Sequence, residues 1–426
     1  MNKQLRHMVL ASCALLTLAA NVRSQPLVIR TLAGQPNPGI ADGAGSNAQF
    51  NGPSSIAVDD AWNVYITDSQ NGTIRKISTN NVVSTFAGSA GSFGSLDGTG
   101  NQARFYGPQG IAVDSAGILF VADTANATIR KITPEGAVST FAGAAGSLNS
   151  FDGVGTNANF FQPEGIAVDK GGNVYVADAW NHTIRKITPL GVVSTLAGLA
   201  GSCGSMDGTN SKARFDRPAG IAVDGATNLF VTDSLNHTVR KITPSGRVTT
   251  IVGLPGVWGN ADGTNGSARL FQPQGIVADN VGNLFVSDSG NQTIRKVSAS
   301  GTNWVVSTVA GLGGSAGDAN GTGDIARFYF PAGLAMNSAG YLLVADSGNN
   351  TIRNEGFELS SLYLLADGRF HFTLNGKSNL NYAVEASSNL IQWSVITNLS
   401  SHDGVLEFVD PTPQMENRFY RAVVSP

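Results

Sequence analysis

The sequence predicts an all-β protein: a closed ring of six four-stranded blades, the β-propeller architecture, followed by a small β-sandwich-like module. One unit of four short runs rich in β-branched residues recurs along most of the chain. The unit opens on a proline that returns after 55 residues four times and then after 58, a period typical of propellers and solenoids. These prolines are Pro53, Pro108, Pro163, Pro218, Pro273 and Pro331.

The first 24 residues predict a signal peptide. Basic residues at the start are followed by an apolar run over residues 8–20, which is too short to span a bilayer. Small-residue cleavage sites end at Ala19 and at Ser24, and a lipoprotein-like box ends at Cys13, so lipidation stays an alternative. We expect a secreted or extracytoplasmic protein, in the periplasm or at the cell surface, with no membrane span.

The composition narrows the classes of partner. The net charge is −3, from 27 basic and 30 acidic residues, and no basic cluster occurs, which disfavours nucleic acid. The 52 glycines and 13% charged residues suit short strands joined by tight turns. After signal cleavage Cys203 is the only cysteine, so no intrachain disulfide can form. We expect a monomer stabilised by packing alone.

The two ends of the repeat array are incomplete in complementary ways. Residues 28–34 have the sequence of a fourth, outer strand with no unit in front of it, whereas the last repeat ends at Arg353 after three strands. In a ring these ends pair and leave no open edge, while a solenoid would need capping repeats, and none is visible. The offset therefore predicts a closed propeller over residues 27–354.

Each outer strand leads into a loop of about twenty residues with an aspartate eleven residues before the next proline. Loops so regular are expected to be ordered. One carboxylate among small polar residues favours a turn over calcium, which takes six to eight oxygens. The aspartates are Asp42, Asp97, Asp152, Asp207 and Asp262, with Asn320 in the sixth loop.

After the ring the period stops. Residues 355–426 alternate apolar and polar side chains in five short runs, which predicts a separate antiparallel β-module, a sandwich.

An aspartate and an arginine recur seven residues apart in every repeat, as in Asp178 and Arg185. A single active site does not need six identical copies. The pairs are therefore interpreted as structural ion pairs and left out of the candidate site.

The repeat from Pro163 to Gly198 resembles the NHL repeat, with the pattern P-x-G-I-A-V-D, then G-N-x-Y-V-A-D-x-x-N-x-T-I-R-K-I, then G-x-V-x-T-x-A-G. The resemblance implies a β-propeller whose P-x-G-I-A-V strands line the central channel and whose V-x-T-x-A-G strands form the rim. The family includes ligand-binding domains, scaffolds, sensor ectodomains, RNA binders and a lyase with a histidine-held metal, so it implies a fold more firmly than a function. The tail is similar to C-terminal modules of large secreted bacterial proteins.

The ring holds only two histidines, His182 and His237, so a three-histidine metal site cannot be built there. Both stand at one loop position, where the other repeats have Gly72, Ala127, Gln292 and Asn350, so a variable surface position is the alternative interpretation. We expect no cofactor, with a divalent metal left open.

Function in a repeat array is expected where the copies differ, because shared residues build the blades. The variable residues beside the prolines and between the second and third strands should converge at one mouth of the channel. An aromatic platform beside charged groups suits a small polar ligand, a glycan or a peptide. The candidate ligand-binding residues are Glu164, Trp180, His182, Asp216, Arg217 and His237.

The sequence favours a non-catalytic binding or interaction propeller. One alternative is a metal-assisted lyase or lactone hydrolase at the same mouth, with Glu164 and Asp216 as metal ligands or general base. The other is a structural cell-envelope protein whose tail directs sorting or anchoring.

Overall fold

The computed structural model describes residues 25–377, 380–388, 392–402, 404–411 and 419–425. The predicted signal peptide, its cleavage site and Cys13 lie outside these residues. The described chain consists of strands and short 3₁₀ turns without an α-helix. No helix in this part of the chain is long and apolar enough to cross a membrane.

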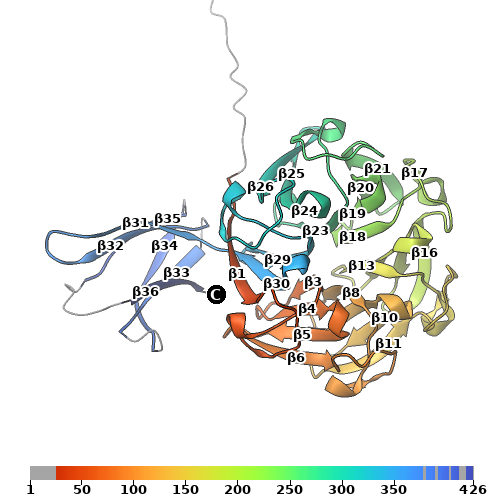
Figure 1. Cartoon of the computed structure of the whole chain (residues 1–426). Helices are drawn as coiled ribbons and strands as arrows, with labels where there is room; N and C mark the ends of the chain where they lie inside the picture. The colour runs from red at the N-terminus through yellow and green to blue at the C-terminus, as the bar shows by residue number, and fades with distance from the viewer. Residues whose placement is uncertain (1–24, 378–379, 389–391, 403, 412–418, 426) are drawn as a thin grey trace, which may run out of the picture.

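Six five-stranded antiparallel sheets stand around a central axis as the blades of a propeller (Figure 1). The innermost strands are β3 (Pro53–Val58), β8 (Pro108–Val113), β13 (Pro163–Val168), β18 (Pro218–Val223), β23 (Pro273–Ala278) and β28 (Pro331–Met336). The second strands are β4 (Val64–Asp68), β9 (Leu119–Asp123), β14 (Val174–Asp178), β19 (Leu229–Asp233), β24 (Leu284–Asp288) and β29 (Leu342–Asp346). The third strands are β5 (Thr73–Ile77), β10 (Thr128–Ile132), β15 (Thr183–Ile187), β20 (Thr238–Ile242), β25 (Thr293–Ser300) and β30 (Thr351–Glu355). The fourth strands are β6 (Val82–Gly88), β11 (Ala137–Ala142), β16 (Val192–Gly198), β21 (Arg247–Val252), β26 (Asn303–Ala310) and, from the N-terminus, β1 (Val28–Gly34).

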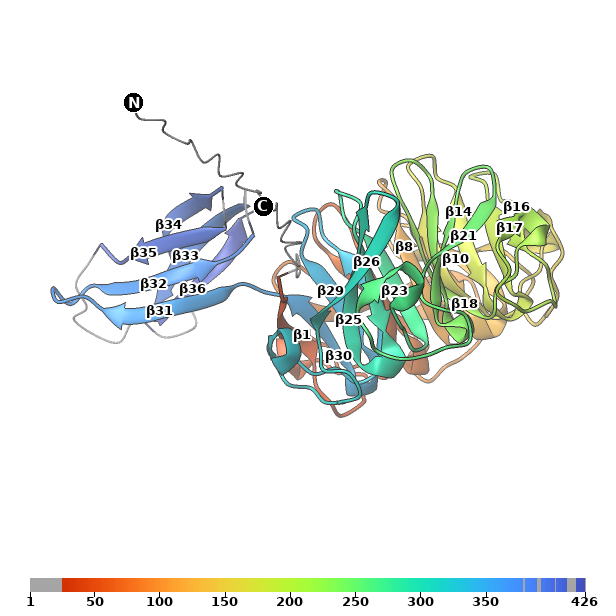
Figure 2. The ribbon, with the colours of Figure 1, turned by 90° about the horizontal axis from the view of Figure 1, so that it is seen from above.

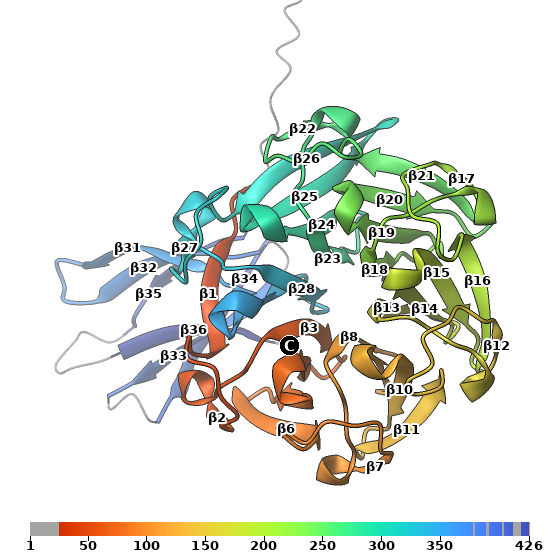
Figure 3. The same ribbon diagram turned by 45° about the vertical axis from the view of Figure 1, so that its right-hand side comes forward.

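The N-terminal strand closes the ring as predicted. Strand β1 pairs antiparallel with β30, with Thr31 opposite Arg353 and Gly34 opposite Thr351. In Figure 3 β1 stands in the same blade as β28, although the two strands are far apart in sequence. The first and last repeats therefore complete one blade, and the predicted all-β six-bladed propeller is confirmed.

The blades differ from the prediction in having a fifth strand. A two-residue strand from each long loop pairs with the outer strand, as Gly153 pairs with Val193. The loop can do this because the Asp152 carboxylate accepts hydrogen bonds from Arg185 and from the backbone N–H of Thr195. A 3₁₀ turn follows each short strand. The short strands are β2 (Gly43–Ala44), β7 (Gly98–Thr99), β12 (Gly153–Val154), β17 (Gly208–Thr209), β22 (Gly263–Thr264) and β27 (Gly321–Thr322).

A buried arginine holds each blade together. The Arg185 guanidinium is fully buried and donates to Asp178 at 2.8 Å and to Asp152 at 2.8 Å. It also lies over the Phe160 ring at 5.1 Å. Burial raises the pKa of Asp178 to about 6, and Arg185 and three hydrogen bonds act against this rise. The other blades repeat the arrangement with Arg75, Arg130, Arg240, Arg295 and Arg353, and Asn320 takes the place of the loop aspartate in the last.

The hydrophobic core is divided among the contacts between neighbouring blades. In the contact between the second and third blades, Phe120 and Ile129 pack with Phe160, Ile166 and Val176. Alternating side chains of each strand enter such clusters, as expected for sheets packed face to face.

The described residues of the tail form two three-stranded sheets beside the ring (Figure 2). One contains β31 (Glu358–Leu364), β32 (Phe370–Asn375) and β35 (Val405–Val409), and the other β33 (Leu380–Ser387), β34 (Ser394–Ser401) and β36 (Phe419–Ser425). They share a core that includes Phe372, Tyr382 and Phe408. Tyr382 also reaches the ring, where its hydroxyl lies 2.7 Å from that of Tyr341. Because β30 runs to Glu355, the predicted boundary at residue 355 falls on the last residue of the ring.

Candidate functional site

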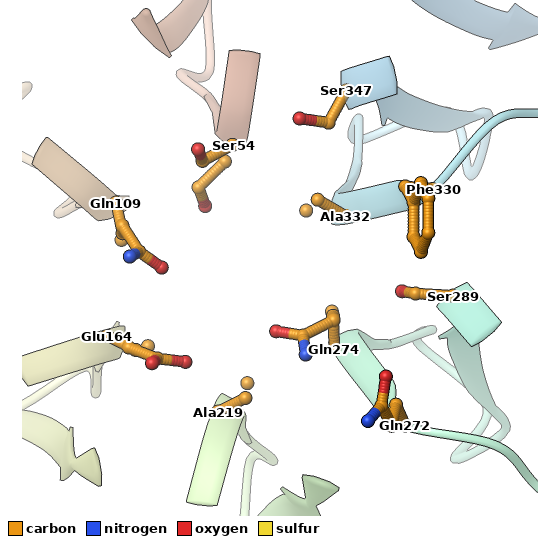
Figure 4. Close-up of a pocket in the computed structure, with 16 residues that line it drawn as sticks. Ser54, Gln109, Glu164, Ala219, Gln272, Gln274, Ser289, Phe330, Ala332 and Ser347 are labelled. Carbon is orange, nitrogen blue, oxygen red and sulfur yellow. The ribbon is translucent and has the colours of Figure 1, made fainter. Parts of the chain in front are cut away.

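The innermost strands surround a cavity of about 250 Å³ on the propeller axis. The residue after each proline lines it, so that every blade contributes one side chain (Figure 4). These residues are Ser54, Gln109, Glu164, Ala219, Gln274 and Ala332.

The next residue along the strand allows this close arrangement. It is glycine in five blades, and a Cβ on Gly110 would lie 2.1 Å from the carbonyl oxygen of Glu164 in the neighbouring blade. A Cβ on Gly165 would lie equally close to the carbonyl oxygen of Ala219. In these five blades glycine lets the inner strands approach closely, which keeps the cavity small, and Ser55 stands at this position in the first blade.

The one charged residue among the cavity walls is Glu164, and its partner is Arg217 of the next blade. The side chain of Glu164 is 4% exposed, and its Oε1 accepts from Nε of Arg217 at 3.0 Å and from Nη2 at 2.9 Å. Burial raises the pKa of Glu164, and the arginine acts against this rise. The pair balances its charges at the edge of the cavity.

The remaining polar walls are neutral. Gln272, Gln274, Ser289 and Ser347 contribute amide and hydroxyl groups, and Phe330 contributes an aromatic ring. Gln274 donates from Nε2 to the Ser234 hydroxyl at 3.1 Å. The cavity therefore offers several hydrogen-bond donors and acceptors without a net charge.

The six predicted site residues do not form one site in the structure. Glu164 lines the cavity, and Arg217 forms an ion pair with Glu164. His182 and Asp216 lie side by side, with Nδ1 and Oδ1 3.6 Å apart. Arg217 connects the two groups, because its backbone N–H donates to His182 Nδ1 at 3.1 Å.

Trp180 and His237 do not line the cavity. Trp180 is 47% exposed and packs against Phe161, with ring centroids 5.7 Å apart. His237 packs edge-on against Phe271 at 5.7 Å, and its Nδ1 accepts from the backbone N–H of Gln272 at 3.2 Å.

Burial lowers the pKa of both histidines, and in His182 the Asp216 carboxylate partly offsets that effect. Both rings accept hydrogen bonds at Nδ1. They are therefore neutral near pH 7, with the proton on Nε2.

Sequence reasoning missed a group of exposed aromatic pairs around the mouth. Phe93 packs on Tyr106 at 5.4 Å, and Trp258 packs on Phe271 at 4.9 Å. Trp258 is 63% exposed and Phe93 49%. The signal was available, because Phe93 and Trp258 stand at one position of the repeat, five residues after the outer-strand glycine.

Phe330 and Gln272 were also missed. Each immediately precedes the repeat's proline, and each has a left-handed backbone, with φ of 48° and 47°. Arg217 occupies the same position in its blade with φ of 51°. The position thus carries residues that face the mouth in several blades.

A profile of the NHL repeat matches residues 105–132, 160–187 and 328–353. The chain is 28% identical over 367 residues to protein SUPPRESSOR OF QUENCHING 1, chloroplastic, of Arabidopsis thaliana, covering 81% of this chain and 34% of the relative. It is 28% identical over 302 residues to NHL repeat-containing protein 2 of Bos taurus, covering 62% of this chain and 41% of the relative. The chain thus spans well under half the length of these relatives.

Solved structures share the fold. A protein of unknown function from Bacteroides thetaiotaomicron superposes with a TM-score of 0.60 and 21% identity, covering 78% of this chain and 76% of the other. An auxiliary nutrient binding protein from the same organism superposes with a TM-score of 0.59 and 15% identity, covering 78% and 77%. At these identities the likeness concerns the fold alone.

Proposed function

We propose that this chain of NHL repeats, closed into a six-bladed β-propeller, is an exported binding protein that takes a small polar ligand, or the end of a glycan or peptide, at the mouth of its channel. The observation that supports this proposal most is the ring of side chains around the axial cavity, one from each blade. A concave site with convergent polar groups is the common form of a small-molecule site.

The chemistry of the walls indicates a neutral, hydrogen-bonding ligand. The amides of Gln109, Gln272 and Gln274 both donate and accept, and the charge of Glu164 is already balanced by Arg217. The volume of about 250 Å³ is below the usual range of ligand pockets, which begins at roughly 300 Å³. A small molecule, or the terminal unit of a longer chain, suits that volume.

The exposed aromatic pairs favour a ligand that extends beyond the cavity. Phe93 with Tyr106, Phe161 with Trp180, and Trp258 with Phe271 belong to loops at the same end of the blades. Exposed apolar groups rimmed by polar residues mark binding surfaces. Flat rings of this kind can pack against the faces of sugars or against peptide side chains.

The geometry supports binding over the alternative of a lyase or lactone hydrolase with Glu164 and Asp216 acting together. Glu164 is engaged by Arg217 inside the cavity, whereas Asp216 lies beside His182. The two carboxylates therefore have different partners and different exposure, 4% for Glu164 and 30% for Asp216.

The binding proposal is tested with a screen of glycans, short peptides and small polar metabolites, followed by calorimetry on the ligands found. Glu164→Gln and Gln274→Ala should each weaken binding by at least about tenfold, which is about 1.4 kcal/mol. Gln102→Ala is the matched control, because Gln102 is an exposed glutamine outside the cavity. Binding unchanged in both cavity variants, and in Trp180→Ala with Arg217→Ala together, would overturn the proposal.

The role of residues 355–426 in sorting or anchoring is a separate proposal. Deleting them should change where the exported protein is found and leave the ring folded, as judged by fractionation and by thermal melting. An unchanged location with a folded ring would remove that role.

A further inference from the structure

We propose that His182, Cys203 and Asp216 form a zinc site on the mouth face, between the third and fourth blades. One ligand atom from each residue lies within 4.8 Å of the other two. We call this group the interblade triad. It is separate from the axial cavity, since none of its members is a wall of that cavity.

Three separate segments bring the triad together, one between β14 and β15 and two from the long connection between β16 and β18. His182 follows the 3₁₀ turn η6 (Ala179–Asn181), Cys203 lies in the long loop after β16, and Asp216 precedes β18. The two loop ends are tied to the blades by backbone hydrogen bonds, from the N–H of His182 to Ala179 and from the N–H of Leu235 to Asp216. His182 and Asp216 are thereby held in place before any metal arrives.

The three side chains of the triad are of the types that bind zinc in proteins. Imidazole nitrogen, thiolate sulfur and carboxylate oxygen are the three ligand types that zinc takes, and softer sulfur disfavours magnesium and calcium. Ligands at tetrahedral zinc lie about 3.3 to 3.8 Å apart by the usual bond lengths. Nδ1 of His182 and Oδ1 of Asp216 are already 3.6 Å apart.

The protonation state of His182 suits coordination through Nδ1. Nδ1 of His182 carries a lone pair, because it accepts from the backbone N–H of Arg217 at 3.1 Å. Zinc would exchange this hydrogen bond for a metal bond. Cys203 is exposed, so a metal can enter from solvent and keep water as the fourth ligand.

The equivalent positions of the other blades show that the triad departs from the repeat. In place of Cys203 they have Pro38, Phe93, Leu148, Trp258 and Ala316. In place of Asp216 they have Asn51, Tyr106, Phe161, Phe271 and Tyr329. At two of the other blade contacts the residues in these positions pack against each other, Phe93 on Tyr106 and Trp258 on Phe271. Only between the third and fourth blades is such packing replaced by metal-binding side chains.

The same residues could suggest a cysteine hydrolase, and the geometry disfavours it. A nucleophile and an orienting carboxylate use opposite nitrogens of the imidazole, which keeps them far apart. Here the sulfur and the carboxylate lie within 4.8 Å of each other and of one nitrogen. Convergent donors of this kind suit chelation.

The test uses the full chain with Cys13→Ser, which leaves Cys203 as the only thiol. Cobalt(II) is titrated in as a spectroscopic substitute for zinc. We expect one equivalent to produce a thiolate-to-cobalt charge-transfer band and the visible bands of tetrahedral cobalt, both reversed by zinc. Zinc should also protect Cys203 from alkylation.

Four substitutions decide the outcome. Cys203→Ser should abolish the charge-transfer band, and Asp216→Asn and His182→Asn should each weaken binding by about tenfold or more. His182→Asn is expected to fold, because Asn350 accepts the same backbone hydrogen bond in its blade. His237→Asn is the matched control at the equivalent position and should leave the charge-transfer band and the affinity for cobalt unchanged.

Two results would overturn the site. One is the absence of a charge-transfer band in the parent chain. The other is a band that depends on Cys203 and is unaffected by His182→Asn and Asp216→Asn, because that would indicate a thiol binding cobalt alone. Melting curves of each variant without metal show whether all of them are folded.

Discussion

A 3₁₀ turn lies between the second and third strands of each blade, and the residue after it helps to join neighbouring blades at the mouth. This residue adopts a left-handed backbone, and where its side chain has an acceptor, that acceptor receives the backbone N–H of the residue before the next proline. His182 accepts from Arg217 at 3.1 Å and Gln292 from Phe330 at 2.6 Å. Asparagine tolerates this conformation well, and Asn350 uses it in the sixth blade with φ of 55°.

The two histidines at this position should make stability depend on pH. Their pKa values are lowered in the folded state, so their contribution is fully present above the unfolded value of about 6.5 and is lost as the pH falls from there through the folded pKa. The double variant His182→Asn with His237→Asn should therefore lose less unfolding free energy between about pH 7.5 and about pH 5. Urea unfolding at several pH values measures this, and an undiminished loss in the variant would contradict it.

The two aspartates that bind each blade arginine differ in burial, and we expect them to contribute differently to the free energy of unfolding. Asp178 is fully buried, and Asp178→Ala leaves the buried Arg185 without its closest acid, which typically costs about 3 to 5 kcal/mol. Asp152 binds the same arginine but is 51% exposed, so Asp152→Ala should cost only about 1 kcal/mol. Equal losses in chemical denaturation would show that burial is not the deciding factor.

Each outer strand ends in a way that only glycine permits. A register shift between Ile184 and Arg185 bends the strand pair, and the strand then ends at Gly198 with φ of +91°. A Cβ there would lie 2.4 Å from the carbonyl oxygen of His182. The same glycine recurs at Gly34, Gly88, Gly143, Gly253 and Gly311, with φ between 88° and 92°. This position therefore couples the outer strand to the loop at the mouth.

A pair of glycine variants separates backbone strain from steric conflict. Gly201 also has a positive φ, of 72°, but nothing lies within 4 Å of a Cβ added there. Gly201→Ala should cost about 1 to 2 kcal/mol from backbone strain, and Gly198→Ala clearly more, since it adds a clash with backbone. Denaturant midpoints compare the two, and equal costs would contradict the close contact at Gly198.

Closure of the ring is a property of the whole molecule. Strand β1 comes from the start of the repeat array. It completes a blade whose other long strands, β28, β29 and β30, come from the end of the array. Its Ile29 is fully buried in a cluster with Phe328 and Val344. Without this pairing both ends would present open strand edges, which are liable to fray and to associate.

Equivalent substitutions in the first strand and in an interior blade test the closure. Ile29 and Val193 occupy the same strand position, and both are buried. Ile29→Ala should cost about 2 to 5 kcal/mol, and Val193→Ala should destabilise the chain to a comparable extent. In an open array the terminal strand would contribute little, so a near-neutral Ile29→Ala variant would argue against a closed ring.

The sequence alone determined the number of blades, the position of their strands and the closure, because these follow from local periodicity and from the two incomplete ends. A proline that recurs after 55 residues four times and then after 58, with a β-branched run after it, is visible without coordinates. Because the unit is repeated, the same strand pattern is seen six times, and each copy supports the strand positions predicted from the others. The paired role of Asp152 and Arg185 was not visible, because their contact depends on the path of a long loop.

Only the tertiary structure decided which variable residues meet. The sequence grouped Glu164, Trp180 and His237 with the others at one mouth, but the structure gives these three different partners. It also brought Cys203, which had no assigned role, to within 4.8 Å of His182 and Asp216. The physical reason is that local sequence patterns specify the strands of each blade. Contacts between side chains of neighbouring blades depend instead on the path of the folded loops at the mouth of the channel.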